Sequence, residues 1–255
     1  MGFVPDGAVR PLFGDDVNMR SGPSLKNETL VRLKAGTMIV VISRTEIALN
    51  LGSYSDYWYK VKAEVDKRQY TGYIWGGLIS KACAEGDFDF DGKKDILAAG
   101  ITHCDEEGRK WAQIRLLSGG VIRDSVLFRL GDFTDNPQSE NSKFFNYSVS
   151  MDILSGRYEN FTVVKLESYY EACDYPGYFY LAATDGKKIF LVAQENFSSG
   201  EGGGIEVSAS VSEKGISMGK HSYENIFGES GDASVKTVEK SENIYVFEGN
   251  NFNKK

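Results

Sequence analysis

A short acidic segment, residues 87–95, has the residue types and the spacing of a cation-binding loop. It reads DFDFDGKKD, so carboxylates occupy loop positions 1, 3, 5 and 9, and a glycine occupies position 6. Hard cations such as Ca²⁺ take several oxygen ligands at roughly 2.3–2.6 Å, which aspartates alternating around a glycine turn can supply. The segment therefore predicts a calcium site whose ligands would be Asp87, Asp89, Asp91, Asp95 and the carbonyl of Lys93.

The pattern departs from an EF-hand at loop position 12, where Ala98 stands in place of the bidentate glutamate. Residues 86–100 instead resemble a single FG-GAP or VCBS-type hairpin, in which the ninth-position aspartate closes the site and an apolar strand follows. Those families repeat the motif around a propeller, whereas this sequence holds one copy. The resemblance implies a cation that stabilises the domain, and an acidic turn without metal is the alternative interpretation.

Nucleophilic catalysis has few candidate residues here. The chain contains two histidines, His103 and His221, and three cysteines, Cys83, Cys104 and Cys173. Cys173 precedes His221 at a separation compatible with a cysteine peptidase, but its neighbours lack the small and apolar residues that seat a nucleophile at a helix N-terminus. We therefore assign no catalytic residue. A disulfide between Cys104 and Cys173 is the pairing to test, and a bridge-free chain remains the alternative.

Composition and charge exclude several classes of protein. The chain has 255 residues, 41% of them hydrophobic, and a formal net charge of -7 without any run of lysine or arginine. Nucleic acid is therefore not expected as a partner. No stretch approaches 18 consecutive apolar residues, so we predict no transmembrane segment. The first ten residues have neither the basic nor the apolar part of a signal peptide.

The elements that must position these residues are β-strands. Twenty-eight glycines, 13% aromatic residues and short alternating runs, such as residues 38–42, 58–62 and 72–75, are typical of strands separated by turns. A linker is predicted near residues 81–85, which divides the chain into domains 1–80 and 81–255. We predict an all-β protein, with a small SH3-like barrel followed by a larger antiparallel β domain, either a sandwich or a partial propeller.

The N-terminal part resembles bacterial SH3 (SH3b) domains. Residues 17–24 read VNMRSGPS, like the opening motif of that family, and residues 33–37, 58–61 and 72–79 match its later strands. The resemblance covers about a quarter of the chain. It implies a small barrel, whose expected core consists of Val17, Met19, Val40, Trp58, Val61 and Ile74.

SH3b modules resemble targeting domains that hold bacterial cell-wall peptides or other proteins. Four aromatic residues would form an amphipathic groove for such a peptide: Tyr54, Tyr57, Tyr70 and Trp75. The alternative interpretation is that these four residues are ordinary aromatic residues of strands, each with one edge of the ring in contact with water. The resemblance implies a non-enzymatic exported binding protein in the periplasm or on the cell surface, with an envelope peptide or protein as partner. A cell-wall hydrolase and a purely structural domain pair are the other hypotheses.

Overall fold

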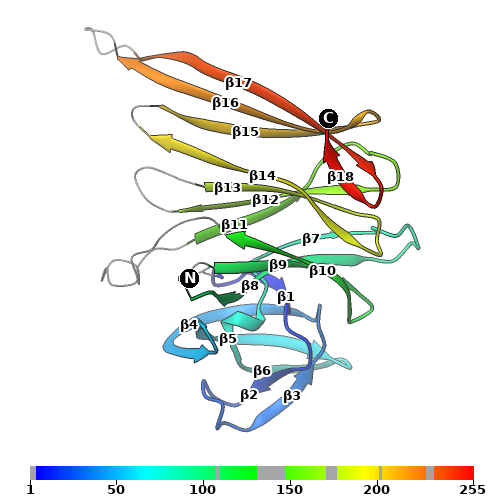
Figure 1. Cartoon of the computed structure of the whole chain (residues 1–255). Helices are drawn as coiled ribbons and strands as arrows, with labels where there is room; N and C mark the ends of the chain where they lie inside the picture. Colours follow the sequence, from blue (N-terminus) through cyan, green and yellow to red (C-terminus); the bar gives the residue numbers. More distant parts are fainter. Residues whose placement is uncertain (1–3, 107–109, 131–146, 171–176, 201–202, 228–232) are drawn as a thin grey trace. The chain divides into compact units, whose positions relative to one another are not determined.

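The computed structural model describes residues 4–106, 110–130, 147–170, 177–200, 203–227 and 233–255. Within them, eighteen β-strands and one short 3-10 helix form three antiparallel sheets, which confirms the predicted all-β class (Figure 1). The chain divides into two compact units, residues 1–144 with 186–189, and residues 145–185 with 190–255. In the described part of the chain, no helix has the length and apolar character needed to cross a bilayer.

The first sheet is a curled half-barrel with the strand order β1-β4-β5-β6-β2-β3. Its strands are β1 (Val9–Pro11), β2 (Val17–Arg20), β3 (Thr29–Leu33), β4 (Met38–Leu51), β5 (Tyr54–Val65) and β6 (Arg68–Trp75). The helix η1 (Gly76–Leu78) follows β6. β4 pairs with β5 through two register shifts, and such bulges increase the bend of a strand. The sheet can therefore curl around a small core.

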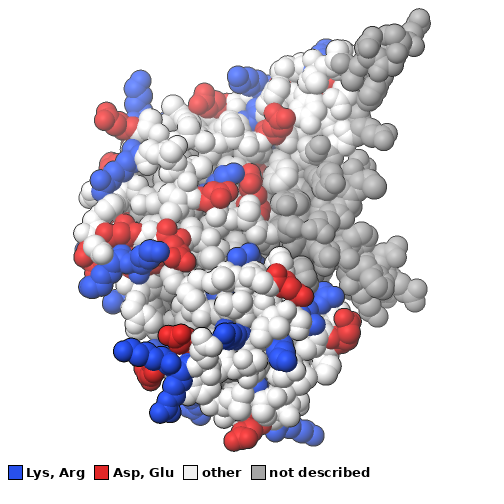
Figure 2. Space-filling view, turned by 180° about the vertical axis from the view of Figure 1, so that it is seen from behind, with Lys and Arg blue, Asp and Glu red and all other residues white. Residues whose placement is uncertain are grey.

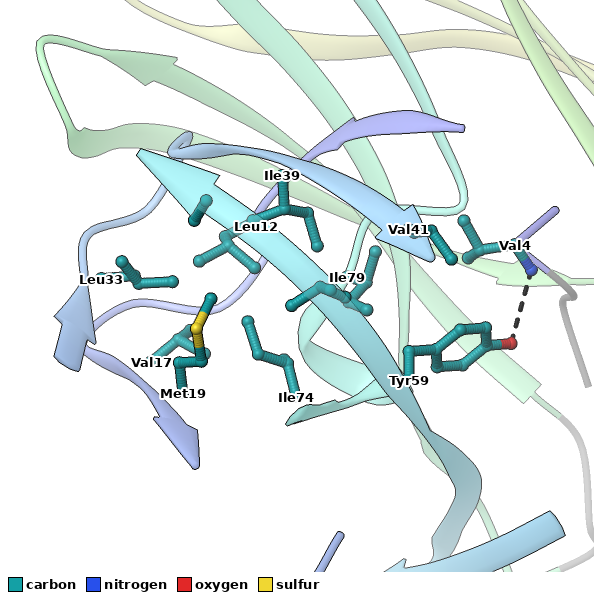
Figure 3. Close-up of a cluster of buried hydrophobic side chains, with 12 residues drawn as sticks. Val4, Leu12, Val17, Met19, Leu33, Ile39, Val41, Tyr59, Ile74 and Ile79 are labelled. Carbon is teal, nitrogen blue, oxygen red and sulfur yellow. Dashed lines mark hydrogen bonds between the residues drawn. The ribbon is translucent and has the colours of Figure 1, made fainter. Parts of the chain in front are cut away.

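Side chains that alternate along these strands fill the half-barrel (Figure 3). Val17, Met19, Val61 and Ile74 lie in this core, as predicted. Two expected members do not: Val40 is 40% exposed because its neighbours Ile39 and Val41 face inward, and Trp58 is buried outside this cluster. The core is composed of Val4, Leu12, Val17, Met19, Leu33, Ile39, Val41, Tyr59, Val61, Ala63, Ile74 and Ile79.

A four-stranded sheet completes the first unit. Its order is β10-β9-β8-β7, formed by β7 (Ala82–Gly86), β8 (Asp95–Cys104), β9 (Lys110–Ser118) and β10 (Val121–Leu130). Most of the predicted linker at residues 81–85 lies in the edge strand β7, in which Ala82 and Ala84 are buried and Glu85 is exposed. A second apolar cluster joins the two sheets and consists of Phe13, Ala35, Ala98 and Leu117. The domain boundary predicted after residue 80 thus separates two sheets within the first unit. The boundary between the two compact units lies between residues 144 and 145.

The second unit is built on an eight-stranded meander in which each strand pairs with the next one in sequence. Its strands are β11 (Tyr147–Ile153), β12 (Thr162–Tyr170), β13 (Gly177–Thr184), β14 (Ile189–Gly200), β15 (Gly203–Ser212), β16 (Gly215–Phe227), β17 (Ala233–Glu248) and β18 (Asn251–Lys254). Its core contains several aromatic rings in mutual contact, among them Phe161, Phe190, Phe247 and Phe252. One face of this sheet is therefore apolar, which leaves the other face for polar side chains.

Charged side chains of both signs are scattered over the described part of the surface in Figure 2. On the face drawn in Figure 2, lysine and arginine are interspersed with aspartate and glutamate. This mixture agrees with the composition, 29 basic and 36 acidic residues. The distribution of charge therefore does not identify a binding surface. A candidate site has to be identified from the contacts of individual side chains.

Candidate functional site

The acidic loop connects two strands of the four-stranded sheet. Strands β7 and β8 pair up to Gly86 and Asp95, so that residues 87–94 form the hairpin connection between them. The turn brings three of the predicted ligands together, because carboxylate oxygens of Asp87, Asp89 and Asp95 all lie within 4.8 Å of one another. Asp95 is buried, Asp87 is half-buried and Asp89 is exposed. The cluster is thus anchored at the strand end and open at the loop.

Backbone hydrogen bonds shape this loop around its own carboxylates. The N–H of Phe88 donates to Asp95 Oδ2 at 3.2 Å, and the N–H of Gly92 donates to Asp87 Oδ2 at 2.9 Å. Gly92 has φ of 83°, a conformation that glycine adopts without steric cost. The two phenylalanines separate: Phe88 is buried, whereas Phe90 is 51% exposed, so only the first faces a core. The buried ring anchors the loop at its start.

One carboxylate oxygen in the cluster lacks a partner. Asp87 Oδ1 is buried and accepts no hydrogen bond from the described residues. A buried acceptor without a partner is costly, and a bound cation would satisfy it. Asp91 behaves differently, because it accepts hydrogen bonds from the N–H and the Nζ of Lys93, at 2.8 and 3.0 Å. These bonds lower the pKa of Asp91 and raise that of Lys93. The carboxylates that could hold a metal ion are therefore those of Asp87, Asp89 and Asp95, and Asp91 is not part of this group.

The four predicted groove aromatics do not form one surface. Tyr54 and Trp75 are buried and contact each other edge to face, with ring centroids 5.7 Å apart. Tyr57 and Tyr70 instead border the half-barrel core on the other face of the sheet. Trp75 Nε1 donates to the carbonyls of Leu49 and Asp56, at 3.0 and 3.1 Å. Tyr54 and Trp75 are therefore packed inside the protein and are not accessible to a peptide.

A buried polar network, which the sequence analysis did not identify, lies beside Tyr54. Lys81 Nζ contacts Asp56 Oδ2 at 2.7 Å and the carbonyl of Gly76 at 3.0 Å, and the two charged side chains are 3% and 0% exposed. The hydroxyl of Tyr54 donates to Asp56 Oδ2 at 2.8 Å, and the N–H of Tyr57 donates to Oδ1 at 2.7 Å. We call these groups the Asp56–Lys81 network. Burial, followed by the charge of Asp56, raises the pKa of Tyr54 well above its ordinary value.

The sequence did contain a signal for this network. Asp56 stands two residues from Tyr54 and two from Trp58, so strand alternation places its carboxylate on an apolar face. A carboxylate in such a position requires a partner. Lys81 could not be recognised as that partner, because the contact spans 25 residues and depends on the turn through η1.

An open groove of about 640 Å³ lies on the second unit, over strands β12 and β14–β17. Its walls are formed by Glu167, Phe197, Ser198, Ile205, Glu206, Val207, Ser208, His221, Tyr223, Thr237 and Lys240. The strand register explains its polar centre: Glu206 pairs with His221, which pairs with Lys240, so the three side chains form one row across three strands. We call this the polar row. A second hollow of about 300 Å³ shares Ser208, His221 and Lys240 with the groove.

His221 is the central residue of the polar row. Its Nε2 lies 2.9 Å from Thr237 Oγ1, and its Nδ1 lies 3.7 Å from Glu206 Oε2. Cys173, which the peptidase hypothesis pairs with His221, lies outside the described residues. Cys83 and Cys104 are free thiols, and the predicted partner of Cys104 in a disulfide, Cys173, is outside the described part of the chain.

Neither free thiol is activated as a nucleophile. Desolvation by burial raises the pKa of Cys83 and of Cys104, and the thiolate is therefore disfavoured at neutral pH. The other histidine, His103, stacks on Trp111 with ring centroids 5.9 Å apart. The groove around His221 and the Asp87–Asp89–Asp95 cluster are thus the two candidate sites.

No protein-family model, curated protein or solved structure matches this chain.

Proposed function

We propose that the protein is a non-enzymatic binding protein exported to the bacterial cell envelope, where the second unit holds an envelope peptide. The observation that supports this proposal is the groove over β15, β16 and β17, in which the polar row crosses the floor. The SH3b-like opening of the chain supports the envelope setting, in the periplasm or on the cell surface. Nucleic acid remains unexpected as a partner because the net charge is -7.

The groove has the chemistry to bind a short peptide with free termini. Glu206 and Lys240 lie two strands apart, which separates their backbones by about 10 Å. A peptide laid across the strands would place its ammonium group at Glu206 and its carboxylate at Lys240. The rings of Phe197 and Tyr223, which also line the groove, supply apolar contact area. Opposite charges at fixed separation therefore determine the orientation of the ligand.

The test is calorimetric titration of the full chain with a synthetic cell-wall tetrapeptide that has free ends. Lys240→Glu should weaken binding at least about tenfold, because the peptide carboxylate then faces a carboxylate. Lys214→Glu is the matched control, since Lys214 is exposed in the turn between β15 and β16 and does not line the groove. Equal affinities for the two variants, or no binding by the wild-type chain, would reject the proposal.

We propose further that the acidic loop binds a metal ion, and that this ion is calcium. The ligand atoms available are carboxylate oxygens of Asp87, Asp89 and Asp95, and hard oxygen donors of this kind favour Ca²⁺ over soft metals. The unpartnered Asp87 Oδ1 supports a bound cation in particular. The role is structural, because the loop joins two strands of a packed sheet and would be held in one conformation by the ion.

A cell-wall hydrolase is the second candidate function. It is favoured by the sequence of contacts from Thr237 Oγ1 to His221 Nε2 and from His221 Nδ1 toward Glu206. A hydroxyl, an imidazole and a carboxylate in this order can generate a nucleophile. Purified peptidoglycan incubated with the wild-type chain and with His221→Ala distinguishes the candidates. Release of peptide or sugar fragments by the wild-type chain alone would favour the hydrolase.

A further inference from the structure

The Asp56–Lys81 network brings an amine and a carboxyl group together where water is excluded. Lys81 Nζ lies 2.7 Å from Asp56 Oδ2, and the two side chains are 3% and 0% exposed. An ion pair buried to this degree loses the hydration of both charges. Transfer of one proton from the Lys81 ammonium to Asp56 Oδ2 along this contact makes both groups neutral. A neutral amine and a neutral carboxylic acid are the two forms that can condense.

The groups around Asp56 are arranged as an acyl-transfer reaction would require. The N–H of Tyr57 donates to Oδ1 at 2.7 Å, where negative charge would develop when the carboxyl carbon is attacked. The hydroxyl of Tyr54 donates to the other oxygen, Oδ2, at 2.8 Å. Because the pKa of Tyr54 is raised, this phenol keeps its proton. The two carboxyl oxygens thus have separate environments, one suited to a carbonyl and the other to a leaving group.

The carbonyl of Gly76 also holds the Lys81 amine in place. It accepts a hydrogen bond from Lys81 Nζ at 3.0 Å, and the ring of Tyr59 lies 5.8 Å from the same nitrogen. A side chain at position 76 would not fit, because a Cβ there would lie 2.6 Å from the Tyr59 ring and 2.7 Å from Asp56. The backbone of η1 therefore holds the nitrogen against the carboxyl group.

We propose that Lys81 and Asp56 form an intramolecular amide bond without any cofactor. The electron pair of the neutral Nζ attacks Asp56 Cγ, and the N–H of Tyr57 stabilises the charge on Oδ1. The nitrogen then gives up a proton as Oδ2 departs with two hydrogens, one from the earlier proton transfer and one through the Tyr54 hydroxyl, which recovers its own. One C–N bond forms, one C–O bond breaks, and one water molecule leaves. No electron is gained or lost, so no oxidant is needed.

Proximity and burial favour this condensation. Holding two reactants at contact distance replaces a bimolecular step by an intramolecular one, which accelerates such reactions by many orders of magnitude. Because the site is closed to solvent, the released water does not readily return to the amide, which slows its hydrolysis. The product would covalently link β5 to the residue that precedes β7, and so tie the half-barrel to the four-stranded sheet. The bond goes beyond the proposed peptide binding and does not depend on it.

Intact-mass spectrometry of the full chain, denatured after purification, tests the proposal. The expected mass is that of the sequence less one water molecule, and digestion should yield one branched peptide that joins residues 56 and 81. Lys81→Arg should have its full sequence mass, because the guanidinium does not condense. A wild-type chain with its full sequence mass, after prolonged incubation in the folded state, would overturn the proposal whether or not the variant folds.

A second ion pair in the same chain provides an internal control. Lys220 Nζ lies 2.9 Å from Glu195 Oε2, a similar distance, but these side chains are 34% and 30% exposed. Water therefore reaches this pair, and we expect no bond between residues 195 and 220 in the peptide map. A loss of water located at residues 195 and 220, with residues 56 and 81 unmodified, would overturn the argument from burial.

Discussion

The half-barrel and the eight-stranded sheet each have a carboxylate and a lysine in their polar clusters, but in opposite environments. In the half-barrel, Asp56 and Lys81 are almost completely buried, and their charged atoms meet partners within the protein. On the eight-stranded sheet, Glu206 and Lys240 lie in one row with His221, but the Glu206 side chain is 69% exposed. The comparison shows that burial, and not residue type, decides whether a charged group stabilises a fold or remains available to a ligand.

The acidic loop lies between these two extremes. Asp95 is buried like Asp56, whereas Asp89 is exposed like Glu206. Asp87 combines both properties, since one oxygen accepts a hydrogen bond and the other has no partner among the described residues. A site of this kind is anchored to the fold and is still accessible from solvent. It is therefore suited to a metal ion that binds from solution and dissociates again.

The largest effect is expected from breaking the buried network. Lys81→Met leaves the Asp56 carboxylate buried with neither a cation nor the proposed amide bond, and should reduce the free energy of unfolding by at least about 3–5 kcal/mol. Urea denaturation followed by tryptophan fluorescence measures this change. The double variant Asp56→Leu/Lys81→Met should be more stable than Lys81→Met alone, because no unpaired charge remains. A Lys81→Met chain as stable as the wild type would contradict the structural role of burial.

The acidic loop should show an effect of intermediate size. Calcium at about one hundred times its dissociation constant should stabilise the folded chain by about 2.7 kcal/mol, which a thermal unfolding scan detects as a shift of several degrees. Asp89→Ala should abolish this shift. Asp91→Ala is the matched control and should retain most of it, because the Asp91 carboxylate is engaged with Lys93. A shift lost equally in both variants would mean that Asp91 is also a ligand.

Alkaline pH should weaken the buried network through Tyr54. An ordinary tyrosine ionises near pH 10.0, and the pKa of Tyr54 in the folded chain is higher. Above pH 10.0 the unfolded chain loses this proton while the folded chain keeps it, so stability falls as pH rises. The slope contributed by one such group is at most about 1.4 kcal/mol per pH unit.

Unfolding in urea at pH values on both sides of 10.0, on the wild-type chain and on Tyr54→Phe, isolates this contribution. The difference in stability between the two chains should change with pH in this range, since the other titrating groups are common to both. If the free energies of unfolding of the two chains changed with pH in parallel, the pKa of Tyr54 would not be raised in the folded state.

The smallest change in stability is expected at the polar row. Lys240→Glu alters an exposed side chain, and substitutions of this kind usually change the free energy of unfolding by less than about 0.5 kcal/mol. The same substitution should still abolish most peptide binding, so that stability and binding separate. A large loss of stability would show that the polar row belongs to the fold, as the Asp56–Lys81 network does.

Features that depend on short stretches of sequence were predictable. The strand content follows from alternating apolar residues, and the convergence of Asp87, Asp89 and Asp95 follows from spacing within one hairpin. The polar row was not predictable, because Glu206, His221 and Lys240 meet only through the register of three strands. The Asp56–Lys81 contact was missed for the same reason, since residue 81 was interpreted as part of a linker.

The aromatic groove was an avoidable error. Side chains three or five residues apart along a strand lie on opposite faces, because the repeat of a strand is two residues. Tyr54 and Tyr57 are three apart, and Tyr70 and Trp75 are five apart, so alternation alone separates each pair. The structure has this arrangement, with Tyr54 and Trp75 in contact on one face and the other two residues at the half-barrel core.

The strand order of the two units has a consequence for how the chain acquires its structure. In the eight-stranded meander every strand pairs with its neighbour in sequence, so each hairpin can form as soon as its second strand is available. In the half-barrel, β1 pairs with β4, and β2 pairs with both β3 and β6. Closing that sheet requires the loop from β2 to β6 to be ordered first, which costs chain entropy. The first unit is therefore expected to fold more slowly, whereas the second unit can complete each hairpin without waiting for distant segments.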